Sequence, residues 1–283
     1  MTTNTENGAD TGARRSLLSR WLGGATVPAR APANPLAEAA RRFAENTSEN
    51  LFLGVFDSAE AAQASAPSTR PLGYDNPESA ALYFGRMQHE VYDYPAMLWL
   101  QKSLHEGLRS VFDVGGHVGI KYYDFRSPLE FPDDLRWRVC DVPAVVARGS
   151  TVAQRREADR QLSFTSDYAQ LDGFDVLFAS GALQYLPMSL DDWLASVPRL
   201  PRRLIINTTP IHAELGFFTL NSIGTAYCPY RVMAERPFIE ALQRRGYRLL
   251  DQWSNPGKTL LLPGHPQHSL HDYRGFCFDL SRG

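Results

Sequence analysis

The sequence predicts an α/β fold built on a seven-stranded, mostly parallel sheet with a helical region before it. Two observations support this prediction. From Ser110 onward, short apolar runs alternate with helical stretches, the pattern of parallel strands joined by crossover helices. In addition, the apolar run that begins at Val111 ends in an acid and in three glycines by Gly119. This is how a buried strand breaks into a tight turn and then a helix.

Each of the seven expected strands is a short apolar run bounded by turn residues. They lie at Ser110–Val114, Trp137–Cys140, Leu162–Thr165, Val176–Ala179, Leu204–Asn207, Tyr247–Trp253 and Gly275–Leu280. We expect the last strand to be antiparallel. A helix from about Val232 to Arg245 is predicted to end at Gly246, because glycine is favoured just beyond a helix C-terminus.

The N-terminal third divides into a polar tail and a helical region. Residues 1–34 are rich in Thr, Asn, Gly, Ala, Pro and Arg, and we expect a disordered tail. Within it, Arg14–Leu22 is amphipathic and could touch a membrane surface or a partner, or be a transient helix without a role. Residues 35–108 are predicted to be helical, with a break at Pro95. Their aromatic residues either pack the helices on the sheet or line a lid over a pocket, and the region could equally form a homodimer face.

Composition restricts the class of protein. With 283 residues, of which 43% are hydrophobic, the chain can bury a sizeable core. A net charge of -2 argues against a general nucleic-acid binder. No apolar run approaches the roughly 20 residues that a membrane span needs, so stable membrane insertion is not expected. Three widely spaced cysteines and a polar start without a secretory signal predict a cytoplasmic protein.

The glycine-rich segment resembles a known cofactor motif. The run from Asp113 to Gly119, Asp-Val-Gly-Gly-His-Val-Gly, is similar to the first motif of Rossmann-type methyltransferases that use S-adenosyl-L-methionine (AdoMet). In those enzymes an acid precedes a Gly-x-Gly-like turn. The dinucleotide pattern G-x-G-x-x-G does not fit, because Gly115 is followed by a glycine and then by only one more. The other interpretation is a glycine-rich turn of some other α/β protein.

Two further stretches extend the resemblance. Together with Asp141-Val-Pro-Ala-Val-Val146, the glycine run looks like the cofactor half of small-molecule O-methyltransferases, whose pattern is D-x-G-G-G-x-G followed by D-L-P-x-V. The stretch from about 72 to 280, which includes Tyr92-Asp-Tyr-Pro95, is similar to a family of uncharacterised bacterial methyltransferases often associated with surface-polysaccharide loci. The resemblance implies that residues 109–283 form an AdoMet-binding, Rossmann-like methyltransferase domain.

Candidate cofactor contacts lie where sheets of this kind bind ligands, beyond the carboxyl ends of the strands. Asp141 could accept hydrogen bonds from both ribose hydroxyls, or simply cap the next helix. Asp167 could accept from the adenine amino group, or cap a helix in the same way. The residues predicted to bind the cofactor are Asp113, Gly115, Gly116, Gly119, Asp141, Val142, Ser166, Asp167 and Ser180.

One departure from the plant-type O-methyltransferases concerns the general base. Those enzymes carry a His-Asp-Trp run after the fourth strand, whereas this chain has Leu183-Gln184-Tyr185. Gln184 cannot take a proton at neutral pH, so the base comes from elsewhere or none is needed. We predict that His212, after the fifth strand, assists the acceptor and that Gln184 positions it. Tyr185 could orient the acceptor or only pack beneath a lid, and His117 fits a structural role better than a catalytic one.

The sequence therefore predicts an AdoMet-dependent methyltransferase that acts on a small-molecule or saccharide-type acceptor, at oxygen. One alternative is a binding module that kept the AdoMet fold and lost its chemistry, and the other is an NAD-dependent oxidoreductase, which the glycine spacing disfavours. His265, His268 and His271 are interpreted as part of a solvated loop rather than a metal site, because Pro266 interrupts them and neither carboxylates nor cysteines lie nearby.

Overall fold

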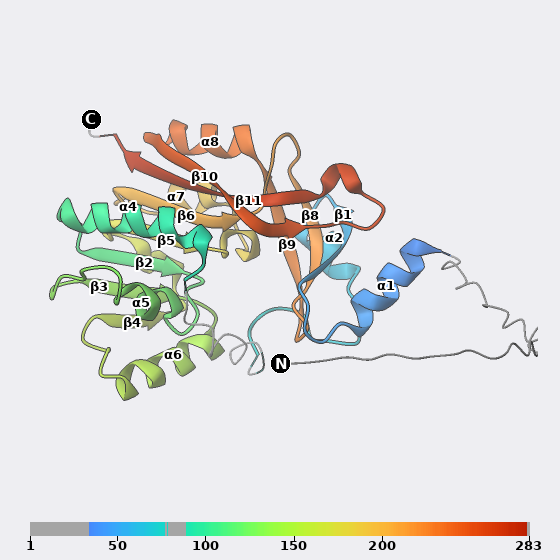
Figure 1. The fold of residues 1–283 in the computed structure, drawn as a ribbon, viewed down its shortest axis with the longest axis horizontal. Coiled ribbons are helices and arrows are strands. Elements are labelled where there is room, and N and C mark those ends of the chain that lie inside the picture. The colour runs from blue at the N-terminus through green and yellow to red at the C-terminus, as the bar shows by residue number, and fades with distance from the viewer. Residues whose placement is uncertain (1–33, 77, 79–88, 282–283) are drawn as a thin grey trace, which may run out of the picture. The chain divides into compact units, whose positions relative to one another are not determined.

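The computed structural model describes residues 34–76, 78 and 89–281 of the chain (Figure 1). The expected tail therefore lies outside the described residues, apart from Asn34, and so do residues 77 and 79–88 of the expected helical region. The elements that precede the large sheet are α1 (Pro35–Glu45), β1 (Leu51–Phe56), α2 (Ala59–Ala64), the 3₁₀ turn η1 (Val91–Asp93) and α4 (Tyr94–His105). The helices expected between 35 and 108 are thus joined by a strand that the pattern did not predict. Pro95 lies in the first turn of α4, where proline is tolerated, so α4 begins at the break that the sequence predicts there.

Seven strands form the large sheet and confirm the predicted fold class. They are β2 (Ser110–Val114), β3 (Arg136–Cys140), β4 (Leu162–Thr165), β5 (Val176–Ser180), β6 (Arg203–Thr209), β10 (Tyr247–Leu260) and β11 (Leu270–Leu280). Their order across the sheet is β10-β11-β6-β5-β2-β3-β4. The central strands pair in parallel, and β11 runs antiparallel to both of its neighbours, as expected of the last strand.

Helices cover both faces of this sheet. The remaining helical elements are α5 (Ile120–Phe125), α6 (Pro143–Arg155), η2 (Tyr168–Leu171), η3 (Leu183–Tyr185), α7 (Leu190–Ala195), α8 (Glu235–Arg244) and η4 (Pro266–His268). Alternate residues of each strand point to opposite faces, so Phe112 packs with Trp193 of α7 while Val111 packs with Leu100 of α4. Both faces are apolar because both are buried, which explains the near-continuous hydrophobic strands.

The order of the strands locates the expected ligand crevice. From β2 the chain adds β3 and β4 on one side, and then crosses to place β5 and β6 on the other. The order therefore reverses between β2 and β5, and open α/β sheets bind ligands beyond the carboxyl ends of the strands at such a point. The glycine turn that follows β2 lies at this position.

A second sheet of four strands packs against the β10–β11 hairpin of the first. It has the order β1-β8-β9-β7, with β7 (Ile211–His212), β8 (Phe217–Ser222) and β9 (Tyr227–Ala234) drawn from the segment between β6 and α8. The prediction of a helix from Val232 was wrong at its start, because Val232 pairs with Phe217 of β8 and α8 begins only at Glu235. Among the described residues, no helix is long and apolar enough to cross a bilayer.

Candidate active site at the carboxyl edge of the sheet

The glycine turn after β2 tolerates only glycine at several positions. Gly115 and Gly119 have positive φ angles of 68° and 89°, which other residues rarely adopt. A Cβ atom on Gly115 would lie far inside the contact distance of Ala182, in the loop after β5. A Cβ on Gly116 would overlap the carboxylate of Asp113. The backbone of the turn therefore lies directly against the ends of β2 and β5.

Asp141 ties this turn to the start of α6. One carboxylate oxygen, Oδ2, accepts the backbone N–H of His117 at 2.9 Å, and the other accepts the N–H of Val142 at 2.8 Å. Burial raises the pKa of Asp141 to about 6 against the lowering effect of these two N–H groups, and the carboxylate of Asp75 raises it further. Each oxygen keeps a second lone pair, so the side chain can still accept hydrogen bonds from ligand hydroxyls.

Asp113 forms the buried floor beneath the turn. Its side chain is 1% exposed and accepts a hydrogen bond from Nε1 of Trp137 at 3.0 Å. Burial raises its pKa to about 7, the Trp137 hydrogen bond lowers it, the neighbouring Asp141 raises it again and Lys121 lowers it. Two carboxylates that are costly to ionise thus lie together under the turn. A cationic ligand at this place would stabilise both of them.

Ser166 and Asp167, the contacts predicted after the third strand, are exposed. The carboxylate of Asp167 accepts the N–H of Ala169 at 2.9 Å and so caps the short turn η2. Of the two roles weighed for Asp167, the structure shows the cap.

A polar cluster follows β5 and β6. Ser180 Oγ lies 3.1 Å from Thr208 Oγ1, and Thr208 holds a left-handed backbone conformation with φ of 48°. Its N–H donates to Oδ1 of Asn255 at 3.1 Å, which fixes that conformation. Strained backbone of this kind costs on the order of 1–3 kcal/mol and gathers at functional sites. Gly181 lies beside the hydroxyl of Thr208. A Cβ atom placed on Gly181 would be 3.4 Å from Thr208 Oγ1.

Gln184 lies in the same cluster with an unfilled hydrogen-bonding position. Its side chain is 4% exposed, and within the described residues its Oε1 has no hydrogen-bond partner. Burial raises the pKa of Tyr230 well above its usual value, and a hydrogen bond from Gln184 acts against this shift. That contact directs the amide nitrogen of Gln184 toward Tyr230. The orphaned oxygen is the kind of buried acceptor that a ligand or an ordered water normally completes.

Tyr185 belongs to the wall between the two sheets. Its hydroxyl donates to Oδ1 of Asn221 at 2.9 Å, and its ring packs edge-on against Tyr230 at 5.0 Å between centroids. The side chain is 37% exposed. These contacts fit the packing role, and the exposed part of the ring leaves room for an acceptor contact.

His212 does not have the contacts of a general base. Its Nδ1 accepts the N–H groups of Glu214 and Leu215 at 3.0 and 2.9 Å, and its Nε2 lies 2.9 Å from the carbonyl oxygen of Gln267. Nδ1 therefore holds the lone pair, and Nε2 carries the proton that it donates to Gln267. No lone pair is left for a substrate proton, because both nitrogens bind backbone. The arrangement pins β7 to the hairpin between β10 and β11, and these contacts do not fit the role of base predicted for His212.

A buried polar network at this edge was not predicted. The carboxylate of Asp93 is fully buried and binds the ammonium of Lys121 at 2.7 Å and the amide of Asn207 at 3.1 Å. Oδ1 of Asn207 in turn accepts from Trp253 and Asn255, both at 2.9 Å. The sequence signal was the Tyr-Asp-Tyr-Pro run at 92–95, whose acid we had not placed in the site.

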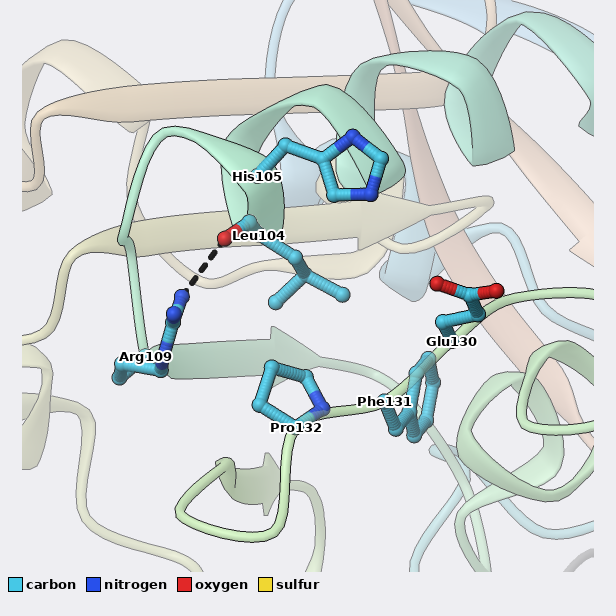
Figure 2. Close-up of a pocket in the computed structure, with 6 residues that line it drawn as sticks. All are labelled: Leu104, His105, Arg109, Glu130, Phe131 and Pro132. Carbon is cyan, nitrogen blue, oxygen red and sulfur yellow. Dashed lines mark hydrogen bonds between the residues drawn. The ribbon is translucent and has the colours of Figure 1, made fainter.

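A surface depression lies elsewhere, away from the glycine turn. It has a volume of about 340 Å³ and is lined by Leu104, His105, Arg109, Glu130, Phe131 and Pro132 (Figure 2). Arg109 immediately precedes β2, so the depression lies at the amino edge, opposite the glycine turn. Nη1 of Arg109 donates a hydrogen bond to the carbonyl oxygen of Leu104 at 2.6 Å, which is a structural contact (Figure 2). Within the described part of the chain, no group of histidines, cysteines and carboxylates is arranged to hold a metal ion.

Comparisons with known proteins find structural similarity without sequence similarity. No protein-family model and no curated protein sequence matches this chain. An S-adenosylmethionine-dependent methyltransferase from Clostridium acetobutylicum ATCC 824 is 9% identical over 68% of this chain and 93% of that one, with a TM-score of 0.46. The mitomycin 7-O-methyltransferase MmcR is 16% identical over 87% of this chain and 66% of its own, with a TM-score of 0.46. Magnesium protoporphyrin IX methyltransferase from Synechocystis PCC 6803, with bound SAH, is 15% identical over 67% and 83%, with a TM-score of 0.43.

Proposed function

We propose that this protein is an AdoMet-dependent methyltransferase that methylates an oxygen of a small-molecule or saccharide-type acceptor. The observation that carries the proposal is the pairing of the glycine turn with Asp141 at the point where the strand order reverses. The carboxylate holds the turn through the N–H of His117 and keeps lone pairs for ligand hydroxyls.

Electrostatics favours AdoMet over a dinucleotide in this crevice. AdoMet carries a sulfonium and an ammonium cation, whereas NAD brings an anionic pyrophosphate. Burial raises the pKa of Asp113 to about 7 and that of Asp141 to about 6, so a cation nearby favours their ionised forms and an anion opposes them. The close fit of Gly115 against Ala182 further supports a ligand that lies on bare backbone.

The chain's contribution to methyl transfer is orientation and exclusion of water. AdoMet supplies a methyl group already activated by its sulfonium, so the protein needs to align an acceptor atom with it. Asp141 would accept hydrogen bonds from the ribose hydroxyls. The unfilled Oε1 of Gln184 would accept a hydrogen bond from the acceptor, beside the hydroxyls of Ser180 and Thr208. An acceptor with several hydroxyl groups suits such a set of donors and acceptors.

Calorimetry with AdoMet, its demethylated product AdoHcy and NAD tests the proposal. We expect AdoMet and AdoHcy to bind and NAD not to bind. Asp141→Ala should weaken AdoMet binding by about tenfold to a hundredfold, since a charge-assisted hydrogen bond contributes roughly 1.5–3 kcal/mol. Asp134→Ala is the matched control, because Asp134 is 71% exposed and precedes β3 at the opposite edge. Unchanged affinity in Asp141→Ala would remove the proposed site.

A second candidate function is a binding module that holds AdoMet without transferring its methyl group. Two observations favour it: Gln184 stands where a histidine base would be expected, and both nitrogens of His212 are bound to backbone. Transfer of a labelled methyl group from AdoMet to a panel of phenols, sugars and polyols separates the two functions. Binding without any transfer would favour the module.

A further inference from the structure

A histidine and an aspartate form a pair that neither the fold nor the proposed cofactor contacts require. Nδ1 of His89 lies 3.1 Å from Oδ1 of Asp124 in α5. The Asp124 side chain is 5% exposed and that of His89 is 32% exposed. Oδ2 of Asp124 has no hydrogen-bond partner among the described residues. A buried carboxylate thus pairs with a partly exposed imidazole. Burying a carboxylate costs free energy, and packing alone does not explain why the chain accepts that cost here.

The pair fixes which nitrogen of His89 carries a proton. A carboxylate can only accept, so Nδ1 must be the donor and Nε2 keeps its lone pair in the neutral ring. The ring of Tyr94 packs edge-on against the imidazole, with 5.4 Å between centroids, and restrains its rotation. His89 therefore keeps an unprotonated Nε2 on a partly exposed ring, which is the reverse of the arrangement at His212.

The carboxylate side of the pair lies close to the glycine turn. α5 begins directly after Gly119, and Asp124 is five positions further along. At about 1.5 Å per residue, this places Asp124 roughly 7 Å along the helix from the turn.

The imidazole side adjoins the end of β6. The N–H of Glu90, the next residue after His89, donates to Oδ2 of Asp93 at 2.9 Å. Asp93 in turn binds Nδ2 of Asn207, near the carboxyl end of β6, at 3.1 Å. His89 is therefore connected to the carboxyl edge from both sides, through α5 and through η1.

His89 is the group that pairs with Asp124, because the other charged groups nearby are directed elsewhere. Lys121, one turn earlier in α5, directs its ammonium to Asp93 at 2.7 Å. Glu90 is exposed. The cation that faces Asp124 is accordingly the imidazole, once it has taken a proton.

We propose that His89 is the general base of the reaction and that Asp124 is its positioning residue. This inference rests on the proposed methyltransferase function. Nε2 takes the proton of the acceptor hydroxyl while the oxygen's electron pair forms the bond to the methyl carbon of AdoMet. The carbon–sulfur bond breaks and its electron pair remains on sulfur, so that an imidazolium and a neutral thioether result. The buried carboxylate of Asp124 stabilises that imidazolium.

The first test measures the accessibility of His89 without requiring an acceptor. Diethyl pyrocarbonate modifies unprotonated, accessible imidazoles, and mass spectrometry of peptides reports each histidine separately. We expect His89 to be modified in the free protein and to lose this modification when AdoHcy is bound. His105, exposed at the amino edge, is the control and should react equally in both samples. AdoHcy binding with His89 still fully modified would overturn the role of the pair, whereas absence of AdoHcy binding would overturn the proposed function itself.

The second test examines the tautomer. Nitrogen NMR of the imidazole rings should show His89 with the proton on Nδ1 in the wild type, and Asp124→Asn should abolish this preference without unfolding the protein. A proton on Nε2 in the wild type would refute the pair as a base. With an acceptor that the wild type methylates, His89→Gln should lower kcat by about a hundredfold or more, the usual contribution of a general base. His105→Gln is the control, and an unchanged kcat in His89→Gln would also refute the assignment.

Discussion

The two edges of the large sheet differ in how completely their buried polar groups are paired. At the amino edge, the guanidinium of Arg203 is 2% exposed and binds Glu106 at 2.8 Å and Asp279 at 3.1 Å. Beside it, Asp175 accepts from the hydroxyl of Ser110 at 2.7 Å and from its N–H at 2.9 Å. Charge and hydrogen-bonding capacity of these groups are balanced within the chain, although Nε of the neighbouring Arg202 has no hydrogen-bond partner among the described residues.

The carboxyl edge leaves several polar groups incomplete. Oε1 of Gln184 and Oδ2 of Asp124 have no partner among the described residues, and burial raises the pKa values of Asp113 and Asp141. Thr208 also holds a strained backbone there. Protein interiors rarely tolerate such groups, so their concentration at one edge indicates that a ligand completes it.

The largest expected effect concerns stability at the amino edge. Arg203→Ala should lower the free energy of unfolding by about 3 kcal/mol, because it removes the buried cation nearest to Glu106 and Asp279 and leaves them only the longer ion pairs with Arg202. AdoMet affinity of the folded protein should stay the same. Urea unfolding and calorimetry measure the two quantities. Arg202→Ala is the control and should cost less than about 1 kcal/mol, since Arg202 is 31% exposed and its ion pairs are longer, at 3.6 and 3.8 Å. A loss of affinity in Arg203→Ala would contradict the division between the edges.

The second prediction separates backbone strain from the ligand site. Gly115→Ala should cost about 2 kcal/mol of stability and abolish AdoMet binding, because it combines a positive φ with a clash against Ala182. Gly107→Ala shares the positive φ, 87°, but a Cβ there meets no atom within 4 Å. This control should cost about 1 kcal/mol, as left-handed backbone does for other residues, and leave binding intact. Normal AdoMet binding by Gly115→Ala would mean that the turn does not cradle the ligand.

A third prediction uses pH. Because burial raises the pKa of Asp113 from 3.8 to about 7, its contribution to stability is fully present below pH 4 and is lost as the pH rises through 7. The loss amounts to at most about 1.4 kcal/mol per pH unit for one proton. Asp113→Asn should flatten the dependence of unfolding free energy on pH between 4 and 7. Asp172→Asn is the control of opposite sign, because Arg199 lowers the pKa of Asp172 and its contribution disappears as the pH falls. If the unfolding free energy of Asp113→Asn depended on pH as steeply as that of the wild type, the raised pKa would not belong to the carboxylate of Asp113.

The smallest expected effect concerns the strained backbone and the hydroxyl contact of Thr208. Thr208→Gly relieves the left-handed strain but removes the hydroxyl contact with Ser180, so stability should change by less than about 1 kcal/mol. Glu157→Gly, at an exposed positive φ of 52°, relieves strain without losing such a contact and should stabilise the protein by about 1 kcal/mol. Thermal or urea unfolding distinguishes the two. An equal gain at both positions would show that the Thr208 hydroxyl contributes nothing to the cluster.

The local patterns predicted the large sheet well and the smaller one not at all. Strands such as Ser110–Val114 and Leu162–Thr165 match their predicted bounds, because a strand buried on both faces is a continuous apolar run. β1 instead pairs with β8, with Phe52 opposite Asn221. The stretch Leu51–Phe56 is itself an apolar run, but its partner β8 lies far along the chain and carries buried polar residues such as Asn221, so no local pattern joined the two into a sheet.

What the sequence determined by itself was the position of the central strands along the chain and the site of the glycine turn, since these follow from apolar runs and from residues that lack a Cβ. Only the tertiary structure provides the contacts from which we propose one histidine rather than another as the base. Both nitrogens of His212 are taken by backbone groups, one of them more than fifty positions away, while His89 obtains a carboxylate from a helix thirty-five residues downstream. The protonation and accessibility of an imidazole depend on the groups that surround it in space, and the order of residues along the chain does not specify those neighbours.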